Sequence, residues 1–216
     1  MTAGKKSYRT YFLGDACLCW SLGGAISRQT SLRVLFAYRR LKADKHLLKL
    51  GVRDLVPSYT ALAVHADPLS DWRKIRLAVG RCFDSLPAAG TALRQRTARH
   101  ILPVSYRGED LRRVAELSGL ETEEVIRRHT TAEYMVAMIG FRPHFPYLLG
   151  LDKKLATPRL NSPRLKVPAG AVAIGGGQTG VYPEESPGGW NILGMTDPAL
   201  LKPIEPGDIV VFKRIP

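Results

Sequence analysis

The sequence predicts an α+β protein with two domains, a small α/β sandwich followed by a β-barrel or β-sandwich. Strand and helix patterns alternate within the first 90 residues, whereas short strands and turn residues dominate after residue 98. Between them, residues 87–97 contain Pro, Gly and several Arg without a sustained hydrophobic period, as is typical of a linker. With 216 residues, of which 45% are hydrophobic, the chain is long enough for two cores. We therefore expect domains over 1–90 and 98–216.

The first domain is expected to contain three strands and two helices. Apolar residues alternate with polar ones in the strands and recur at helical spacing in the helices. Ser70 or Asp71 is suited to cap the second helix, because a short polar side chain accepts hydrogen bonds from the free N–H groups of a first turn. The elements are a strand over 9–20, a helix over 27–50, strands over 52–57 and 60–65, and a helix over 72–86. This order is typical of a ferredoxin-like sandwich.

The second domain is expected to consist of short strands with two helices. The segment 121–129 has Glu at its start and Arg128 and His129 at its end, which complements the helix dipole, and Thr122 is expected to be its N-cap. Ser118-Gly119 is expected to end the preceding helix. The elements are a strand over 100–106, helices over 110–117 and 121–129, and strands over 134–141, 171–174, 190–195 and 208–212. Short strands between structured turns indicate a barrel or a sandwich.

The stretch from Gly140 to Trp190 is rich in Pro, Gly and aromatic residues. Proline fixes φ and glycine permits positive φ, so their density prescribes a specific path for irregular backbone. The interleaved aromatic and β-branched side chains supply apolar surface that a disordered linker lacks. We therefore expect ordered, loop-rich β structure that presents a surface. Gly175-Gly176-Gly177 lacks the helix and the Lys of a phosphate-binding loop and is interpreted as a tight turn.

The excess of basic over acidic residues lies almost entirely in the first half of the chain. Residues 1–100 contain 18 Lys and Arg against 6 Asp and no Glu, whereas residues 101–216 contain 14 Lys and Arg against 13 Asp and Glu. The basic residues are scattered, without interleaved aromatic side chains on which bases would stack, so a nucleic-acid partner is not expected. A solvated basic face and docking to an acidic partner protein both remain open.

The three cysteines do not form a disulfide framework. Cys17, Cys19 and Cys82 are odd in number, which favours reduced thiols and a cytoplasmic location. The Cys17-Leu18-Cys19 pair has no second pair nearby to complete four zinc ligands, so no metal site is expected. The apolar run over 11–26 is interrupted by Asp15 and two glycines and lacks a cleavage pattern, so neither a signal peptide nor a membrane helix is expected.

A few side chains have the chemistry of a binding or catalytic site. His129 and Glu133 are four residues apart, so one could polarise the other for proton transfer, or the two could form a capping or surface pair. Gln178 and Thr179 could bind a small amide or stabilise the turn beside them. Tyr182 and Trp190 could line a pocket or belong to the core. Three arginines could bind a carboxylate or phosphate or could form internal ion pairs: Arg142, Arg159 and Arg164.

Several rigid motifs occur together in the second half, and weaker ones occur in the first. The motifs are, in order, Gly14-Asp15, Ile26-Ser27, Val56-Pro57-Ser58-Tyr59, Asp67-Pro68, Arg128-His129-Thr130-Thr131-Ala132-Glu133-Tyr134, Gly140-Phe141-Arg142-Pro143-His144-Phe145-Pro146-Tyr147-Leu148, Thr157-Pro158-Arg159, Pro163-Arg164, Val167-Pro168-Ala169-Gly170, Gln178-Thr179-Gly180, Tyr182-Pro183 and Ser186-Pro187-Gly188-Gly189-Trp190. Over nearly its whole length the chain resembles the KipI-like family. That family includes kinase inhibitors of sporulating bacteria, B subunits of ATP-dependent 5-oxoprolinases, and the allophanate hydrolase subunit 1 or carboxyltransferase proteins.

The resemblance implies a fold, an activity and partners. It implies a cyclophilin-like β-barrel after the small first domain. It implies one component of an ATP-dependent 5-oxoprolinase that hydrolyses 5-oxo-L-proline to L-glutamate with a larger, KipA-like C subunit and an A subunit, ATP being bound elsewhere in the complex. The family also implies two alternatives, an inhibitor of a sensor histidine kinase, and a biotin-dependent carboxyltransferase or allophanate hydrolase-type component that acts on urea-like amides. An interface or substrate surface would include Phe141, Arg142, Pro143, Phe145 and Tyr147.

The chain departs from the family pattern at four positions. His144 stands where the family usually has Gly, so this side chain is expected either to tolerate a positive φ with strain or to mark an altered loop. Leu160 and Met195 stand where basic residues are usual, and Ala171 replaces a Ser. These departures put the geometry of the site in question more than the fold.

Overall fold

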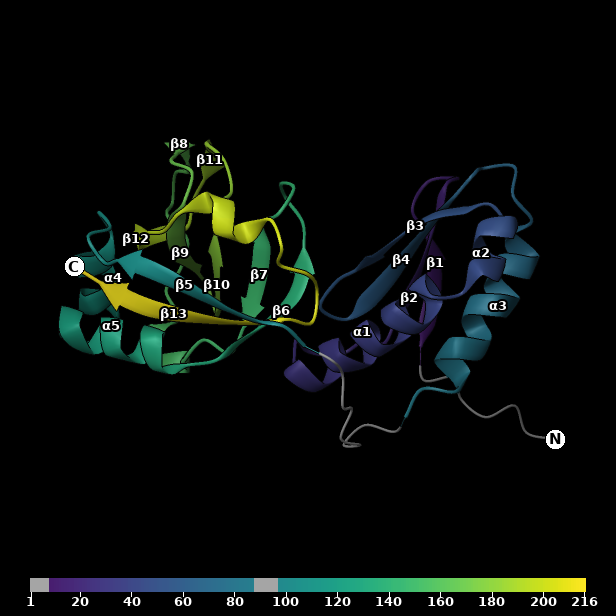
Figure 1. Cartoon of the computed structure of the whole chain (residues 1–216), viewed down its shortest axis with the longest axis horizontal. Coiled ribbons are helices and arrows are strands. Elements are labelled where there is room, and N and C mark those ends of the chain that lie inside the picture. Colours follow the sequence, from purple (N-terminus) through teal and green to yellow (C-terminus); the bar gives the residue numbers. More distant parts are fainter. Residues whose placement is uncertain (1–7, 88–96) are drawn as a thin grey trace. The chain divides into compact units, whose positions relative to one another are not determined.

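The computed structural model describes residues 8–87 and 97–216, which divide between two compact units, Met1–Gln95 and Arg96–Pro216 (Figure 1). The predicted linker over 87–97 lies, apart from its two end residues, outside the described residues. The first unit is a four-stranded sheet with helices, and the second is a closed β-barrel. The mixed α+β class predicted from the sequence is therefore confirmed.

The sheet of the first unit is antiparallel throughout. Its strands are β1 (Arg9–Phe12), β2 (Cys17–Ser21), β3 (Val52–Pro57) and β4 (Ala61–Ala66), and its helices are α1 (Arg28–Lys42), α2 (Lys45–Lys49) and α3 (Trp72–Asp84). The strand order is β1-β2-β4-β3. From β2 onward the chain follows the strand-helix-strand-strand-helix order expected from the sequence, with the short α2 added after α1.

One face of this sheet carries the core of the first unit. The side chains of β4 alternate between buried and half-buried, and Leu62 and Val64 belong to the buried set. Helices α1 and α3 contribute Val34, Val79 and Phe83 to the same cluster. Asp71 caps α3 by accepting hydrogen bonds from the backbone N–H groups of the first turn, as expected.

Two elements predicted for the first unit are wrong in their bounds. The single strand over 9–20 is a hairpin, because Gly14 adopts φ 65° and the Leu13 N–H donates to the Cys17 carbonyl at 2.8 Å. The single helix over 27–50 is two helices, because Asp44 has extended backbone and accepts a hydrogen bond from the His46 N–H. In both places the hydrophobic pattern continues past the residue at which the regular backbone ends, so the pattern alone does not reveal the break.

The second unit is built around seven barrel strands. They are β5 (Arg99–Ser105), β6 (Tyr134–Ile139), β7 (Pro146–Leu149), β9 (Ala171–Gly175), β10 (Gln178–Val181), β12 (Asn191–Met195) and β13 (Ile209–Ile215). The barrel closes in the order β10-β7-β6-β13-β5-β12-β9, and only β13 and β5 are paired in parallel. The remaining elements are the pair β8 (Arg164–Val167) and β11 (Ser186–Gly188), the helices α4 (Leu111–Ser118) and α5 (Thr122–Thr131), and the 3₁₀ turns η1 (Lys153–Leu155) and η2 (Pro198–Leu201).

The helix before α5 ends as predicted, but the start of α5 differs. Gly119 ends α4 in the left-handed conformation with φ 64°. The N-cap of α5 is Glu121 instead of Thr122, and the Glu121 side chain makes no capping hydrogen bond. The predicted strand over 134–141 ends at Ile139, because a tight loop begins at Gly140.

Strand β9 is buried on both of its faces. Val172 and Ile174 belong to the main core, together with residues of the other barrel strands and of α4 and α5. Ala171 and Ala173 point to the opposite side and belong to a separate cluster. Because successive strand residues point to opposite faces, this second cluster lies on the outer face of the barrel wall.

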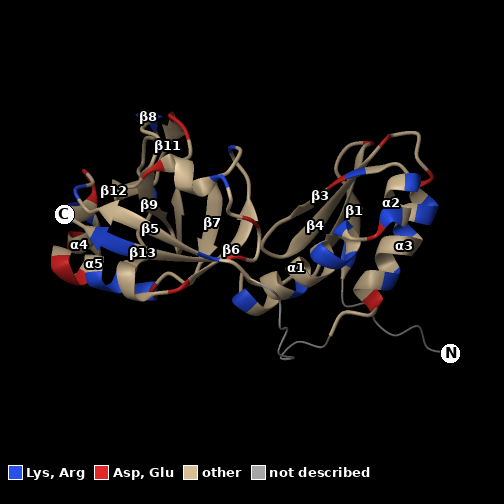
Figure 2. Cartoon of the chain, in the orientation of Figure 1, with Lys and Arg blue, Asp and Glu red and all other residues tan. Residues whose placement is uncertain are grey.

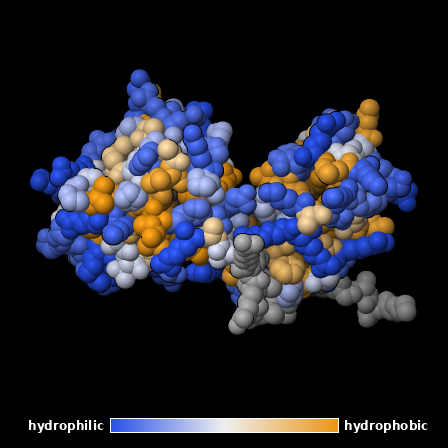
Figure 3. Space-filling model, in the orientation of Figure 1, coloured by the Kyte–Doolittle hydropathy of each residue, from blue (hydrophilic) through white to orange (hydrophobic). Residues whose placement is uncertain are grey.

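Surface charge follows the asymmetry of the sequence. Figure 2 shows Lys and Arg along α1, α2 and α3, and acidic and basic residues interspersed over the second unit. On the face shown in Figure 3, hydrophobic areas are broken up by hydrophilic side chains. None of the helices in the described parts of the chain is long and apolar enough to span a membrane.

An ion-pair cluster fixes β8 to the barrel. Arg164 of β8 contacts Glu109 at 2.9 Å and Asp110 at 2.8 Å. The other carboxylate oxygen of Asp110 accepts a hydrogen bond from the Ile192 N–H of β12 at 2.7 Å. The Asp110 side chain is only 8% exposed, whereas that of Glu109 is 59% exposed. Asp110 thus joins β8, β12 and the start of α4 through one buried group.

We expect Asp110→Asn to lower the free energy of unfolding by about 2 kcal/mol, because the amide replaces an acceptor that faces two donors in a buried position. Urea denaturation at constant m-value measures the change. Glu109→Gln is the matched control, since it removes the exposed partner of the same Arg164 and should cost less than about 1 kcal/mol. Equal losses in the two variants would contradict the role given to Asp110.

Candidate functional site

The cluster on the outer face of the barrel wall is mainly aromatic. Phe145 lies edge-to-face against Tyr182 and Trp190, with ring centroids 5.2 and 5.6 Å away. Tyr147 contacts Trp190 at 5.8 Å, and Phe141 contacts Phe145 at 5.5 Å. We call these five residues the aromatic cluster. Phe145, Tyr182 and Trp190 are buried, Tyr147 is half-buried and Phe141 is exposed, so the cluster has a fixed base and an accessible edge.

Glycines of the same stretch make room for these rings. A Cβ atom on Gly175 would lie 2.5 Å from Nε1 of Trp190, and one on Gly188 would lie 2.3 Å from the Tyr182 hydroxyl. Neither distance is possible for a real side chain, so the rings lie where only glycine permits them to lie. The density of glycine and aromatic residues between 140 and 190 therefore serves ring packing as well as turns.

The loop between β6 and β7 is strained beside the cluster. Phe141 and His144 both have φ 67°, a region that residues with side chains rarely adopt. The Arg142 N–H donates to the Gly140 carbonyl at 2.8 Å, so Phe141 is the central residue of a γ-turn with positive φ. Of the two alternatives expected at His144, a positive φ or an altered loop, the positive φ is present. Pro143 is exposed at the same loop.

The three candidate arginines differ in their partners. Arg142 forms an ion pair with Glu184 at 3.4 Å, and Arg164 is held by Glu109 and Asp110. Arg159 is exposed, and its guanidinium lies over the Trp190 ring, 5.7 Å from the centroid. No acidic partner of Arg159 is present among residues 8–87 and 97–216. Of the three, Arg159 is the one with no carboxylate within ion-pair distance among these described residues.

The acids that hold the other two arginines were not predicted as part of the site. Asp110 stands at the start of a predicted helix and Glu184 between two turn motifs, and neither position indicates an arginine partner. Such pairing depends on residues that lie 42 and 54 positions apart in the chain, so only the fold brings them together.

Two phenols of the cluster lie close to the Arg159 charge. Burial raises the pKa of Tyr147 and that of Tyr182. The Arg159 guanidinium opposes the rise at Tyr147, and at Tyr182 a hydrogen bond with the Trp190 backbone opposes it more than Arg159 does. Both phenols are therefore neutral near pH 7 and able to donate a hydrogen bond. A guanidinium and a neutral phenol on an aromatic base suit a ligand that carries a carboxylate beside an apolar ring.

The predicted proton-transfer pair is not brought together. His129 is fully buried, with Nδ1 2.7 Å from the Tyr106 hydroxyl and Nε2 3.0 Å from Oγ1 of Thr179. Glu133 is half-exposed and forms an ion pair with Arg99. Burial lowers the pKa of His129 to about 3, so its imidazole is neutral. The structure thus gives His129 the role of a satisfied core group.

Thr179 belongs to that internal network, while Gln178 does not. The Thr179 hydroxyl donates to the Ala173 carbonyl at 3.0 Å, so it accepts from Nε2–H of His129, and Nδ1 accepts from Tyr106. Gln178 is half-buried at the start of β10, directly after the three glycines. The predicted tight turn over these glycines joins β9 to β10 and is confirmed.

The remaining departures from the family pattern lie beside the aromatic cluster. Ala171 and Met195 pack against its buried rings. Leu160 is half-buried, and its backbone N–H donates to the Gly189 carbonyl at 2.8 Å. These three residues thus border the aromatic cluster, and none of them is one of its five rings.

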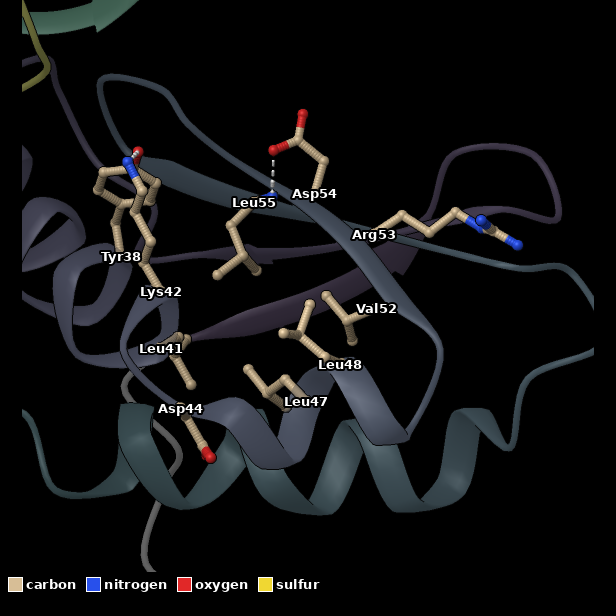
Figure 4. A pocket seen from close by; sticks show the side chains of 10 residues that line it. All are labelled: Tyr38, Leu41, Lys42, Asp44, Leu47, Leu48, Val52, Arg53, Asp54 and Leu55. Carbon is tan, nitrogen blue, oxygen red and sulfur yellow. Dashed lines mark hydrogen bonds between the residues drawn. The ribbon is translucent and has the colours of Figure 1, made fainter.

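The first unit contains a separate pocket of about 240 Å³ (Figure 4). Half of its ten lining residues are aliphatic, and its long polar side chains are engaged: the Lys42 ammonium donates to the Tyr38 hydroxyl at 3.1 Å, and the Arg53 guanidinium donates to Asp67 at 3.1 Å. Arg53 points away from the hollow (Figure 4). The lining residues are Tyr38, Leu41, Lys42, Asp44, Leu47, Leu48, Val52, Arg53, Asp54 and Leu55. This pocket has few converging polar groups, so the aromatic cluster is the stronger candidate.

Comparison with known proteins identifies relatives over nearly the whole chain. The family described as carboxyltransferase domain, subdomain C and D, matches residues 8–207. The 5-oxoprolinase B subunit of Bacillus subtilis (strain 168) is 37% identical over 226 residues, which cover 96% of this chain and 93% of that protein. The 5-oxoprolinase B subunit of Escherichia coli O157:H7 is 50% identical over 121 residues, which cover 51% of this chain and 56% of that protein.

A solved structure supports the same fold. The crystal structure of TTHA0988 superposes with a TM-score of 0.76 and 36% identity, covering 93% of this chain and 40% of that one. This chain therefore spans about two fifths of that protein. The family expected from the motifs is confirmed by these relatives.

We expect the burial of His129 to make the protein less stable in acid. The pKa of His129 is about 3 in the folded protein and about 6.5 in the unfolded chain, so between these values only the unfolded chain binds the proton. The free energy of unfolding should therefore fall by about 1.4 kcal/mol for each pH unit lost below 6.5 on account of this group. His129→Gln should remove that share of the slope in urea titrations from pH 4 to 7. His46→Gln, at an exposed position, is the control, and equal slopes in all three proteins would contradict this account.

We expect the strain at His144 to be visible in stability. With φ 67° at this position, His144→Gly should be more stable than His144→Val by about 2 kcal/mol, because a β-branched side chain is disfavoured there. Thermal and urea unfolding measure the difference. Lys166, exposed in strand β8, is the matched control, and there Val should be the more stable of the two replacements. The same order of stability for Gly and Val at both positions would contradict the presence of strain at His144.

Proposed function

This chain belongs to the family of the carboxyltransferase domain, subdomains C and D, and from this premise we propose that it is the B subunit of an ATP-dependent 5-oxoprolinase. The observation that carries the proposal is the 37% identity to a 5-oxoprolinase B subunit, which extends over 96% of this chain and 93% of that relative. The reaction opens the lactam of 5-oxo-L-proline. Water adds to the lactam carbonyl and the C–N bond breaks, which opens the ring. The carbonyl carbon becomes the side-chain carboxylate of L-glutamate, and the ring nitrogen becomes its amino group.

The chain is proposed to act as a non-autonomous component of the enzyme. Hydrolysis needs a nucleophile, and a general base within hydrogen-bond reach of the proton that this nucleophile gives up. In the described part of the chain, the best-placed base by sequence, His129, is buried and neutral, and its two ring nitrogens are occupied by Tyr106 and Thr179. The glycines over 175–177 form a turn between strands and not a phosphate loop. ATP binding and bond activation are therefore assigned to partner subunits.

The aromatic cluster is proposed to form this chain's share of the site. Its buried rings give a rigid base, and Phe141, Tyr147 and Arg159 present an accessible edge. Aromatic and arginine side chains of this kind are enriched where proteins bind one another. The partners are a larger, KipA-like C subunit and an A subunit, and the edge is proposed to lie between this chain and one of them.

We expect the reconstituted complex to release phosphate and glutamate when supplied with ATP and 5-oxo-L-proline, and to lose both when this chain is omitted. Co-expression with the candidate partner subunits, followed by coupled assays for phosphate and glutamate, measures this. Phosphate release that does not depend on 5-oxo-L-proline, or full activity without this chain, would reject the proposal.

Affinity purification from the native cell separates the alternatives. Recovery of a large carboxyltransferase-like protein together with the A subunit supports the oxoprolinase. A co-purifying histidine kinase, or a biotin-carrying protein active on urea-like amides, would instead support one of the two other family activities.

A further inference from the structure

We propose that Arg159 is the residue of this chain that recognises the carboxylate of the substrate. The inference rests on the proposed function and goes one step further, because it assigns substrate selection to one side chain. It predicts that the complex prefers a lactam with an adjacent carboxylate over the same lactam without one.

The first argument is that Arg159 has no anionic partner in the part of the chain that the structure describes. Arg142 has Glu184, and Arg164 has both Glu109 and Asp110. Within residues 8–87 and 97–216, no carboxylate forms an ion pair with Arg159. An arginine held against a buried aromatic cluster without a counter-ion is suited to receive a ligand anion.

The second argument is that the backbone around Arg159 is fixed. The Pro158 carbonyl accepts a hydrogen bond from Nδ2 of Asn191 at 2.9 Å. The Leu160 N–H donates to the Gly189 carbonyl at 2.8 Å, and Gly176 N–H donates to the Thr157 carbonyl at 2.8 Å. These bonds attach residues 157–160 to the barrel on both sides of Arg159. A fixed receptor loses little freedom when it binds, which favours affinity.

The third argument is the chemistry around the guanidinium. Trp190 supports one face of it, with the ring centroid 5.7 Å away. The phenols of Tyr147 and Tyr182 lie close enough for its charge to act on their pKa values. A guanidinium binds a carboxylate through two parallel hydrogen bonds, which a lysine ammonium does not reproduce. The arrangement therefore fits a small ligand that carries a carboxylate beside a flat, uncharged ring.

The test uses the reconstituted complex and two lactams, 5-oxo-L-proline and 2-pyrrolidinone, which has the same ring without the carboxylate. In Arg159→Gln we expect the KM for 5-oxo-L-proline to rise about 100-fold, as for the loss of a charge-assisted bidentate contact. In Arg159→Lys the KM should rise only about 10-fold, because lysine keeps the charge but lacks the two parallel N–H donors of the guanidinium. Phosphate release with 2-pyrrolidinone should be the same in all three proteins.

Lys166→Gln is the control, because Lys166 is an exposed cation of the same unit whose partner is Glu185. It should leave both KM values unchanged. An unchanged KM in Arg159→Gln, or an equal loss with both lactams, would overturn the inference while leaving the oxoprolinase intact.

An absence of oxoprolinase activity in the complex would reject the proposed function. In that case a binding measurement still tests the role of Arg159. The indole N–H signal of Trp190 is followed by NMR in the full chain during titration with 5-oxo-L-proline and with 2-pyrrolidinone. The inference expects the signal to shift with the first lactam only, and not to shift in Arg159→Gln. No shift in the unaltered chain, or an equal shift in the variant, would overturn it.

Discussion

The structure of the second unit depends on strand β9 being buried on both faces. Val172 and Ile174 point into the barrel, and Ala171 and Ala173 point outward. Small residues on the outward face leave space that large rings fill, so the aromatic cluster packs directly on the barrel wall. The outer cluster therefore inherits the rigidity of a closed sheet, because its base cannot move without opening the barrel.

The three arginines around the aromatic cluster differ in what they contact. Arg164 joins β8 to Asp110, and Asp110 in turn binds the backbone of β12, so this arginine holds covering structure in place. Arg142 is paired within its own region with Glu184. Arg159 instead packs against the Trp190 ring, and the backbone on both sides of it is fixed by hydrogen bonds. Of the three candidate arginines, two are thus held in ion pairs, and Arg159 is exposed beside the aromatic cluster.

The sequence predicted the longer elements because their hydrophobic periods are continuous. Strands β5, β9, β12 and β13 and helix α4 lie where the patterns placed them, within a few residues. The short strands β7, β8, β10 and β11 were not predicted singly, because three or four residues give no measurable period. Burial of His129 and the choice among the three arginines depend on contacts between distant segments, which no local pattern contains.

The strain at Phe141 and His144 is best explained by the cluster beside them. Positive φ at two residues with side chains costs free energy that the surroundings must offset. Here the loop is closed by the Gly140 N–H bond to the Phe145 carbonyl, and Phe145 is buried among the rings. Phe141 contacts Phe145, Phe145 contacts Trp190, and Trp190 supports Arg159. Phe141 and Arg159, which lie at the two exposed ends of this series of contacts, are therefore positioned by one packed set of rings.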